Sequence, residues 1–172
     1  MVKAPLIPQG GNYMSEKYTA PVQKIWSLLN EVYDPEIPVL SVIDLGIILD
    51  VTHAYEITEI TITPTYSGCP AMDAISMDIR LKLLENGFKN IKVTSVLSPV
   101  WTTDSMSEEG KRKLNEYGIA PPQRMSEESQ LPHCPQCNSA DTKLLSQFGS
   151  TSCKALFQCN DCKEPFDQFK CH

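Results

Sequence analysis

The sequence predicts an α+β fold: a small αββαβα domain with a three-stranded sheet, followed by a small C-terminal domain folded around a metal ion. Apolar residues at helical spacing alternate with short β-branched runs over residues 19–118, the pattern of a domain that packs helices on a sheet. Beyond this region, six of the seven cysteines lie between residues 134 and 171, which favours a metal site.

The first helix is expected in TAPVQKIWSLLNEVY, residues 19–33. Thr19 suits the N-cap, and Pro21 suits the first turn, where a backbone N–H is not needed. The apolar residues of this segment fall at helical spacing: Ile25, Leu28, Leu29 and Val32. Asp34-Pro35 is expected to stop the helix, because the residue before a proline avoids α geometry.

Three strands are expected at about 46–53, 56–63 and 90–97. The first two are rich in β-branched residues and are joined by a predicted turn at His53–Glu56, which indicates a hairpin.

Two more helices are expected between and after these strands. Residues 70–86 have helical spacing and end before Gly87, a natural residue for the position after a helix. Ser105 and Glu108 form a capping-box pattern before a short helix that ends at Gly118.

Four segments are therefore expected along the chain: a flexible tail at 1–18, the αββαβα domain at 19–118, a linker at 119–131 and a metal-binding domain at 132–172. The tail and the linker contain many Pro, Gly, Ser, Asn or Glu residues and show no apolar periodicity.

Two Cys-x-x-Cys turns, CPQC at 134–137 and CNDC at 159–162, are separated by 21 residues. The separation is long enough for a hairpin that brings the turns together, and four sulfurs satisfy tetrahedral zinc. The sequence predicts a structural zinc site in a zinc-ribbon-like domain, held by Cys134, Cys137, Cys159 and Cys162. Such a small domain buries little core, so its folding is expected to depend on the ion.

Four more residues of this region are potential ligands, and they receive no firm role from the pattern. His133 is expected to be exposed rather than a ligand. Cys171 and His172 either lie near the zinc site or, more simply, end the chain without a role. Whether Cys153 or Cys171 replaces one of the four predicted ligands stays open.

Cys69 stands alone in TPTYSGCPAMD, residues 63–73. Because Pro70 follows it, the thiol is expected beside the N-cap of the helix at 70–86, near free N–H groups and the positive end of the helix dipole. That setting favours thiolate and lowers a cysteine pKa. The residues alone leave two interpretations open, a working thiol or a small buried hydrophobe.

No catalytic partner for Cys69 is evident, since His53 is the only histidine of the first domain and falls in a predicted turn. Asp34, Glu36 and Asp44, in DPEIPVLSVIDLGI, are oxygen ligands in principle. More simply, Asp34 ends a helix, Glu36 is solvated and Asp44 caps a turn.

Composition excludes several functions. The net charge is −6 and no basic run is present, which argues against a nucleic-acid partner. The first residues contain too short an apolar stretch for a signal peptide, and no apolar run approaches the roughly 18 residues of a membrane span. A cytoplasmic protein without nucleic-acid or membrane partners is expected.

DPEIPVLSVIDLGII followed by TPTYSGCPAMD resembles the paired signature of the MIP18-like family, whose members are associated with iron–sulfur cluster assembly and delivery. The resemblance covers about residues 20–118. With the cysteine-rich segment added, the chain is similar to one narrower group, the PaaD (also called PaaJ) subunits encoded with the phenylacetyl-CoA 1,2-epoxidase system of phenylacetate catabolism.

The resemblance implies that Cys69 is the functional thiol and that the loop of Asp34 and Glu36 lies beside it. It also implies an accessory protein rather than an enzyme, because the di-iron centre, the flavin and the [2Fe–2S] cluster of that system belong to other subunits. The chain is then expected to assist iron–sulfur or di-iron assembly in the oxygenase or reductase subunits. Cys69, alone or paired across a homodimer, would hold iron or a cluster transiently.

Two alternatives remain. The chain is a non-catalytic structural or regulatory subunit that docks the oxygenase through its zinc domain, with Cys69 incidental. A weaker alternative makes Cys69 an enzymatic nucleophile, although no base or oxyanion constellation supports it.

Overall fold

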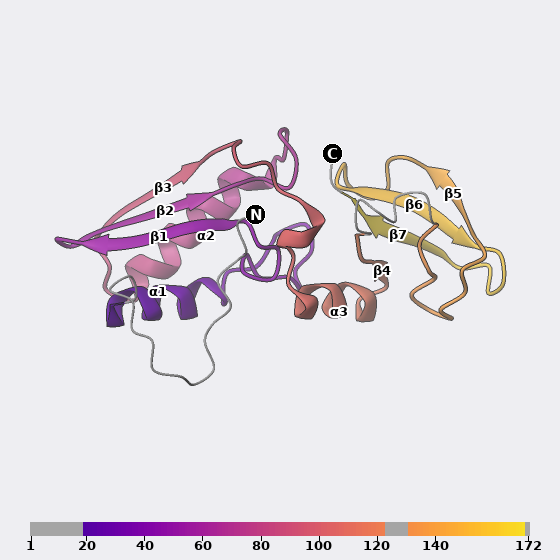
Figure 1. Ribbon diagram of the computed structural model, residues 1–172, viewed down its shortest axis with the longest axis horizontal. Coiled ribbons are helices and arrows are strands. Elements are labelled where there is room, and N and C mark those ends of the chain that lie inside the picture. The colour runs from indigo at the N-terminus through magenta and orange to yellow at the C-terminus, as the bar shows by residue number, and fades with distance from the viewer. Residues whose placement is uncertain (1–18, 123–130, 171–172) are drawn as a thin grey trace.

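The computed structural model describes residues 19–122 and 131–170. The predicted tail, most of the predicted linker, and Cys171 and His172 lie outside these residues. Within them the chain forms an αββαβα domain and then four further strands (Figure 1), which confirms the predicted fold class. None of the described helices is long and apolar enough to cross a membrane.

The N-terminal domain is built on a sheet of β1 (Ile48–Ala54), β2 (Ile57–Ile62) and β3 (Asn90–Ser95), in that spatial order. β1 and β2 form an antiparallel hairpin, and β3 lies parallel to β2. The parallel pair requires a crossover connection, which helix α2 (Ala71–Glu85) supplies. All three strands lie within two residues of the predicted bounds.

The hairpin turn is shorter than predicted. Tyr55 and Glu56 both have positive φ, 51° and 63°, the backbone of a two-residue turn that matches the twist of paired strands. His53 therefore lies on β1 and not in the turn.

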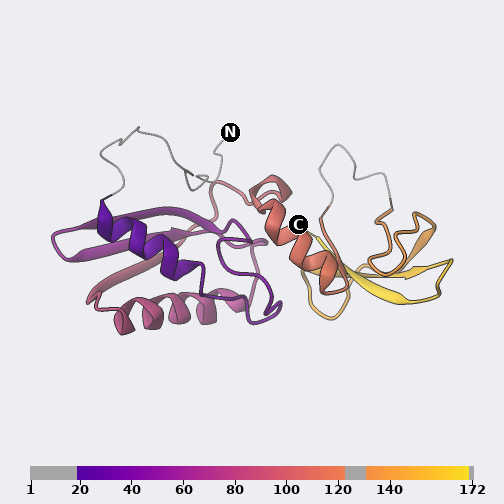
Figure 2. The same ribbon diagram turned by 90° about the horizontal axis from the view of Figure 1, so that it is seen from below.

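Two helices cover one face of this sheet. α1 (Ala20–Leu29) packs against β1, and α2 packs against β3 and α1 (Figures 1 and 2). The largest buried side chains of these elements include Ile25, Leu29, Ile60, Ile62, Ile75, Ile79 and Leu83. Because burying one such side chain contributes roughly 1.5–3 kcal/mol, this layer is the main source of the domain's stability.

α1 ends at Leu29, earlier than the predicted stop at Asp34-Pro35. The chain turns away because the segment after the helix pairs with residues further on. The Val42 N–H donates to the Val32 carbonyl and the Asp34 N–H donates to the Leu40 carbonyl, both at 2.9 Å. Val32 lies outside the helix but is buried, so the apolar pattern correctly indicated a core residue and wrongly indicated a helical one.

α3 (Glu108–Glu116) begins after Ser107, whose Oγ accepts a hydrogen bond from the Gly110 N–H at 2.9 Å. The predicted capping residue Ser105 instead ends a short 3₁₀ helix, η1 (Thr103–Ser105). The predicted cap was therefore wrong by two residues. Tertiary contacts with Asp44 fix the helix start: the Ser107 N–H donates to the Asp44 carbonyl at 2.9 Å, and a Cβ on Gly110 would lie 2.8 Å from the same oxygen.

Asp44 connects α3 to the loop before β1. Its carboxylate accepts hydrogen bonds from the Ser41 N–H (3.0 Å), the Ser41 hydroxyl (2.9 Å) and the Lys113 ammonium (2.7 Å). The side chain is only 6% exposed. Asp44 therefore caps a turn, as the simpler interpretation of the acidic loop expects.

The C-terminal domain, called the ribbon below, is a sheet of four strands: β4 (Ile119–Ala120), β5 (Thr142–Ser146), β6 (Lys154–Cys159) and β7 (Pro165–Phe169). Their spatial order is β4-β7-β6-β5. β5 and β6 form the hairpin predicted between the two Cys-x-x-Cys turns, and β4 runs parallel to β7. Two residues of the expected linker thus belong to this sheet; a strand of two residues is too short to show a period.

The ribbon and the N-terminal domain share a core. Phe169, 2% exposed at the end of β7, packs edge-on against Trp101, 4% exposed, with ring centroids 6.0 Å apart. The Trp101 Nε1–H donates to the Leu45 carbonyl at 2.8 Å. The end of the ribbon where β6 begins faces the loop between β2 and α2 (Figure 1).

Candidate functional site

Cys69 closes the loop between β2 and α2. Its N–H donates to the Tyr66 carbonyl at 3.2 Å. The N–H of Ala71, the first residue of α2, donates to the Cys69 sulfur. The thiol is partly exposed. It therefore lies beside the N-cap residue Pro70, where the sequence placed it, and is accessible from solvent.

The pKa of Cys69 is raised, which corrects the low value expected at a helix N-terminus. Burial of the thiol has the largest effect; the Ala71 N–H lowers the pKa, and the charges of Asp34, Cys153 and Glu36 raise it further. A thiolate loses hydration when it is buried and is repelled by nearby anions. The expectation was wrong because it considered the helix end and neither the burial of the thiol, which has the largest effect, nor the acidic groups near it.

Asp34 lies near Cys69, at the start of the loop that follows α1. Its Oδ1 accepts hydrogen bonds from the N–H groups of Glu36 (2.7 Å) and Ile37 (2.9 Å), so it forms an Asx-type turn. Asp34 is 9% exposed, and burial raises its pKa. Glu36 is exposed, yet its charge acts on both Asp34 and Cys69. Asp34 and Glu36 thus lie close enough to Cys69 for their charges to raise its pKa.

Two residues at this place come from the ribbon and were not predicted. Cys153, in the turn before β6, is buried, and its sulfur lies 3.0 Å from the Thr151 hydroxyl. Burial raises the pKa of Cys153, and its thiolate form would in turn raise the pKa of Cys69. Lys154 is also buried, and its charge lowers the pKa of Asp34. The phenol of Tyr66 hydrogen-bonds with Ser152. The turn before β6 therefore packs against the loop that carries the thiol.

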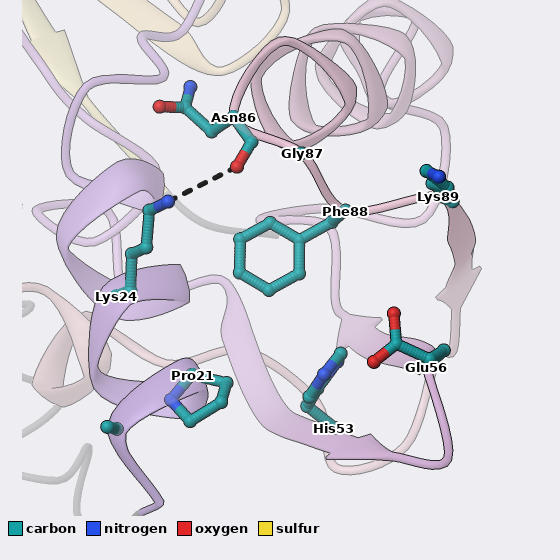
Figure 3. A pocket seen from close by; sticks show the side chains of 9 residues that line it. Pro21, Lys24, His53, Glu56, Asn86, Gly87, Phe88 and Lys89 are labelled. Atoms are coloured by element: carbon teal, nitrogen blue, oxygen red, sulfur yellow. Dashed lines mark hydrogen bonds between the residues drawn. The ribbon is translucent and has the colours of Figure 1, made fainter.

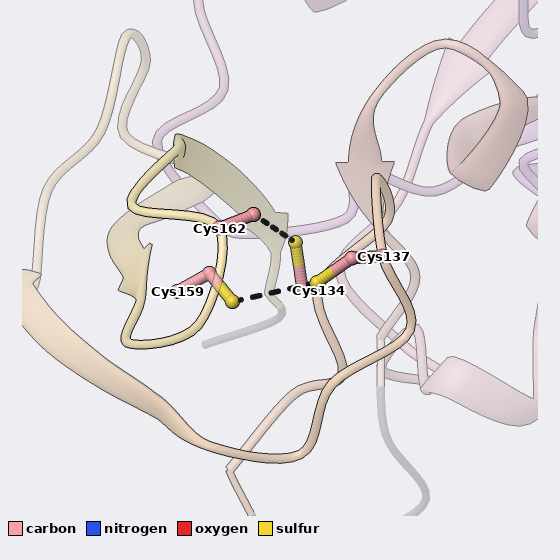
Figure 4. Close-up of side chains that lie close together, drawn as sticks. All are labelled: Cys134, Cys137, Cys159 and Cys162. Carbon is pink, nitrogen blue, oxygen red and sulfur yellow. Dashed lines mark hydrogen bonds between the residues drawn. The ribbon is translucent and has the colours of Figure 1, made fainter.

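The four cysteines of the two Cys-x-x-Cys turns meet at one end of the ribbon (Figure 4). Their sulfurs all lie within 4.8 Å of one another. Cys134 and Cys162 are 3.7 Å apart, and Cys137 and Cys159 are 3.6 Å apart. A tetrahedral ion with metal–sulfur bonds of about 2.3 Å separates its sulfurs by about 3.8 Å. The arrangement fits a metal ion held by four sulfurs.

The pKa values of the ribbon thiols are shifted in opposite directions: that of Cys159 is lowered, whereas those of Cys137 and Cys162 are raised. Burial of the Cys159 thiol raises its pKa, but the N–H groups of Cys162 and Asp161 and the neighbouring cysteines lower it by more, to about 7. His133 is exposed and bonds through Nδ1 to the Asn138 carbonyl at 3.2 Å. It is not a member of the cluster, and neither is Cys153.

His53 lies far from Cys69, because the two residues are at opposite ends of the β1–β2 hairpin. Its Nδ1 is 2.9 Å from the Thr58 hydroxyl, and its ring packs edge-on against Phe88 at 5.4 Å. His53 and Phe88, with Lys24, line a shallow cleft of about 400 Å³ (Figure 3). His53 is thus a packed residue and forms no dyad with the thiol.

Comparisons with known proteins agree with both domains. Residues 22–97 match the family model described as iron–sulfur cluster assembly protein, and residues 119–170 match the PaaD zinc beta ribbon domain. The chain is 49% identical over 153 residues to a putative 1,2-phenylacetyl-CoA epoxidase subunit of Escherichia coli (strain K12), a match that covers 87% of this chain and 93% of that protein. The chain belongs to the PaaD branch of the MIP18-like family.

Other members of the MIP18-like family match only part of this PaaD-type chain. A Fe-S protein maturation auxiliary factor of Porphyromonas gingivalis is 39% identical over 103 residues, which covers 59% of this chain and 97% of that protein. A crystal structure of a DUF59 domain from Bacillus anthracis is 32% identical with a TM-score of 0.51, covering 54% of this chain and 90% of that one. The predicted family and the predicted ribbon are confirmed.

The residues of the two sites differ in how well they could be predicted from the sequence. The ribbon cysteines follow from spacing alone, whereas Asp34 and Glu36 were implied only by the MIP18-like resemblance. Cys153 was left without a role because it lies outside both Cys-x-x-Cys turns. The one signal in the sequence is a cysteine in the otherwise polar segment GSTSCK. The structure shows that this cysteine is buried.

Proposed function

We propose that this chain is a non-catalytic, cytoplasmic accessory protein of phenylacetyl-CoA epoxidase in phenylacetate catabolism. It assists the assembly of an iron–sulfur or di-iron centre in the oxygenase or reductase subunits. Cys69 holds the iron or the cluster transiently, with Asp34 and Glu36 beside it. The identity to an epoxidase subunit and the relationship to Fe-S maturation factors support this assignment.

One observation carries the proposal: a partly exposed thiol lies beside a buried carboxylate, in a domain that matches iron–sulfur assembly proteins. Thiolate is a soft ligand that suits iron–sulfur species. The two histidines in the described part of the chain lie elsewhere, His53 on β1 and His133 at the ribbon. A role in binding therefore fits this place better than acid–base catalysis.

Zinc is the metal that we assign to the four ribbon cysteines, with a structural role. Four thiolates in a tetrahedral arrangement are typical of structural zinc and leave no open coordination position for a reacting group. The ion would stabilise a sheet whose own buried cluster is small: Ala120, Cys134, Ala155, Phe157, Cys159 and Phe166.

A second candidate function is a structural or regulatory subunit that docks the oxygenase. Large apolar side chains that are exposed on the ribbon favour it: Leu144, Leu145 and Phe148. Under this alternative Cys69 is incidental, and the complex forms and loads normally without the thiol.

Iron content of the partners tests the proposal. The oxygenase and reductase subunits are co-expressed with the wild-type chain, with Cys69→Ser, with Ser67→Ala as a matched control in the same exposed loop, or with no accessory chain. We expect iron per partner to fall at least threefold with Cys69→Ser and without the chain, and to stay normal with Ser67→Ala.

Two outcomes would contradict the maturation role of Cys69. Iron that is lost only when the whole chain is absent would support the docking function. Normal iron in all four samples would exclude a role in assembly altogether.

A further inference from the structure

Helix α2 carries large apolar side chains on two opposite sides. The inner row is part of the buried core: Ile75, Ile79 and Leu83. On the outer side, Met77, Leu81 and Leu84 are each about half exposed. Their spacing of four and three residues places them in one row along the helix. Because a helix that is apolar on all sides is typically covered on all sides, the outer row indicates a surface that takes a partner.

The other two α-helices of the described residues have no such row. Beyond its first turn, α1 exposes only polar side chains: Gln23, Lys24 and Ser27. α3 exposes only charged and amide side chains: Glu108, Glu109, Arg112, Asn115 and Glu116. Single exposed apolar residues are normal on a protein surface, whereas a contiguous apolar patch with a polar rim marks an interaction site. α2 lies at one edge of the N-terminal domain (Figure 2), where a partner can reach it.

A shallow groove of about 400 Å³ adjoins this row, between α2 and the segment that follows α1. Leu81 lines the groove together with Tyr33, whose side chain is also about half exposed. The outer row and Tyr33 thus form one apolar surface, called the α2 face below: Tyr33, Met77, Leu81 and Leu84.

The rim of the groove is negatively charged. Lys82 is the one cation in its lining, and its ammonium is paired with the Glu31 carboxylate at 3.0 Å. Asp78 and Glu85 also line the groove and are exposed. Within the part of the chain that the structure describes, their carboxylates form no ion pair or hydrogen bond. Two unpaired carboxylates beside an apolar row complement a partner with both apolar and cationic side chains.

We propose that the α2 face binds an amphipathic helix of an epoxidase subunit, in which Lys or Arg side chains flank an apolar row. This deepens the proposed function and rests on it, because the helix belongs to the oxygenase or reductase subunit that receives the metal centre. Apolar side chains at positions i, i+4 and i+7 are the pattern that one helix presents to another. Cys69 lies just before Ala71, the first residue of α2, so the helix that holds the partner also begins at the thiol.

Charge argues against a second copy of this chain as the occupant. A symmetric dimer uses the same patch on both copies, which would bring Asp78 and Glu85 of one copy towards the same carboxylates of the other. Like charges placed together at an interface oppose association. The chain as a whole has a net charge of −6, so long-range attraction also favours a cationic partner surface.

Binding of purified oxygenase and reductase subunits to the zinc-loaded full-length chain tests the apolar row. Leu81→Asp places a charge in the middle of the row at an exposed position, and circular dichroism checks that the chain stays folded. We expect at least one subunit to bind wild type, and its Kd to rise at least tenfold with Leu81→Asp. Leu145→Asp, the same change at an equally exposed leucine of the ribbon, should leave the Kd within twofold of wild type.

Three results would overturn the docking face. The first is that wild type binds none of the subunits, and the second is that Leu81→Asp binds as wild type does. The third is that Leu145→Asp weakens binding as much as Leu81→Asp or more, which would indicate the ribbon or the added charge alone.

The charges provide a second variant that leaves the apolar row intact. Asp78→Asn combined with Glu85→Gln removes two carboxylates and keeps the shape of both side chains. We expect the Kd to rise several-fold at low salt, and the difference from wild type to vanish at about 1 M salt, where the Debye length is about 3 Å. Asp50→Asn with Asp104→Asn removes two exposed carboxylates elsewhere and is the matched control. An unchanged Kd, or an equal change in both double variants, would refute a cationic partner.

Cross-linking identifies the occupant directly. The photoreactive residue p-benzoylphenylalanine is placed at Met77 in the chain co-expressed with the epoxidase subunits, and cross-linked peptides are identified by mass spectrometry. We expect a peptide of the oxygenase or reductase subunit in which Lys or Arg flanks apolar residues at helical spacing. A cross-link to residues 1–18 of this chain, to a second copy of it, or to an acidic segment of a subunit would overturn the proposal.

The binding and co-expression experiments separate the docking face from the maturation role. Binding that is lost with Leu81→Asp, combined with normal iron in the partners of Cys69→Ser, leaves the docking face and removes the role of the thiol. Iron loss with Cys69→Ser, combined with binding that is unchanged in Leu81→Asp, does the reverse.

Discussion

The carboxylate of Asp34 does two things at once. It holds the turn after α1 through two backbone N–H groups, and it places a negative charge near a thiol. The first role needs only an oxygen acceptor, whereas the second needs the charge. An amide in its place would separate the two roles.

Asp34→Asn is therefore expected to keep the turn and to lower the pKa of Cys69, because it removes an anion that raises that pKa. The alkylation rate of Cys69 by iodoacetamide is measured against pH in zinc-loaded protein, with the Cys69 peptide followed by mass spectrometry. The midpoint of the rate profile should move to lower pH. Asp50→Asn, an exposed aspartate on β1, is the control; an equal midpoint for both variants would count against the role of Asp34.

Residues with a local reason for their position could be predicted, and the others could not. The four ribbon cysteines occur as two Cys-x-x-Cys motifs, and the spacing of these motifs was enough to predict a shared metal site. Asp34, Cys69 and Cys153 are widely separated along the chain, and only tertiary packing brings them together. The raised pKa of Cys69 was missed for the same cause, since its largest contribution is burial by distant residues.

Helices and strands, like single residues, were predicted where a local pattern defines them. The three strands and α2 were predicted closely because each shows a period of apolar residues or a glycine stop, as at Gly87 with φ of +93°. The end of α1 and the start of α3 were wrong. At both places a contact with another segment sets the boundary. After α1, residues 32–34 hydrogen-bond with residues 40–42, and at the start of α3 the chain packs against the Asp44 carbonyl.

The cap of α3 gives a direct test of this view. Ser107→Ala should destabilise the protein by about 1 kcal/mol, because the Gly110 N–H loses its acceptor at the helix start. Ser105→Ala should lower the free energy of unfolding by less than about half of that amount, because the Ser105 side chain does not cap α3. Urea unfolding of the two matched variants, followed by circular dichroism, measures the difference. Equal costs would restore the capping box that the sequence suggested.

At the scale of the whole molecule, the contact between Trp101 and Phe169 holds the ribbon against the N-terminal domain. Both side chains are nearly fully buried. Their contact was not predictable, because aromatic residues in a loop and at a chain end carry no pattern that names a partner. The position of the ribbon against the N-terminal domain depends on this contact.

Phe169→Ala should loosen the ribbon at a cost of about 3–5 kcal/mol, the usual range for truncating a buried phenylalanine. Alkylation of Cys69 should become faster as the ribbon moves away, while zinc content stays at the wild-type level. Phe148→Ala is the control, because that ring is 63% exposed. Unchanged Cys69 alkylation in Phe169→Ala would mean that the ribbon does not cover the thiol in solution.

β4 determines where a fragment that contains the whole ribbon must begin. Ile119 and Ala120 pair with Asp167 and Gln168 on β7, so the ribbon takes its outer strand from the N-terminal side of the segment that was expected to be a linker. A fragment that starts at Pro132 would expose the edge of β7, and an open strand edge invites pairing with another copy. Transplanting this ribbon onto another protein would therefore require residues from 119 onward.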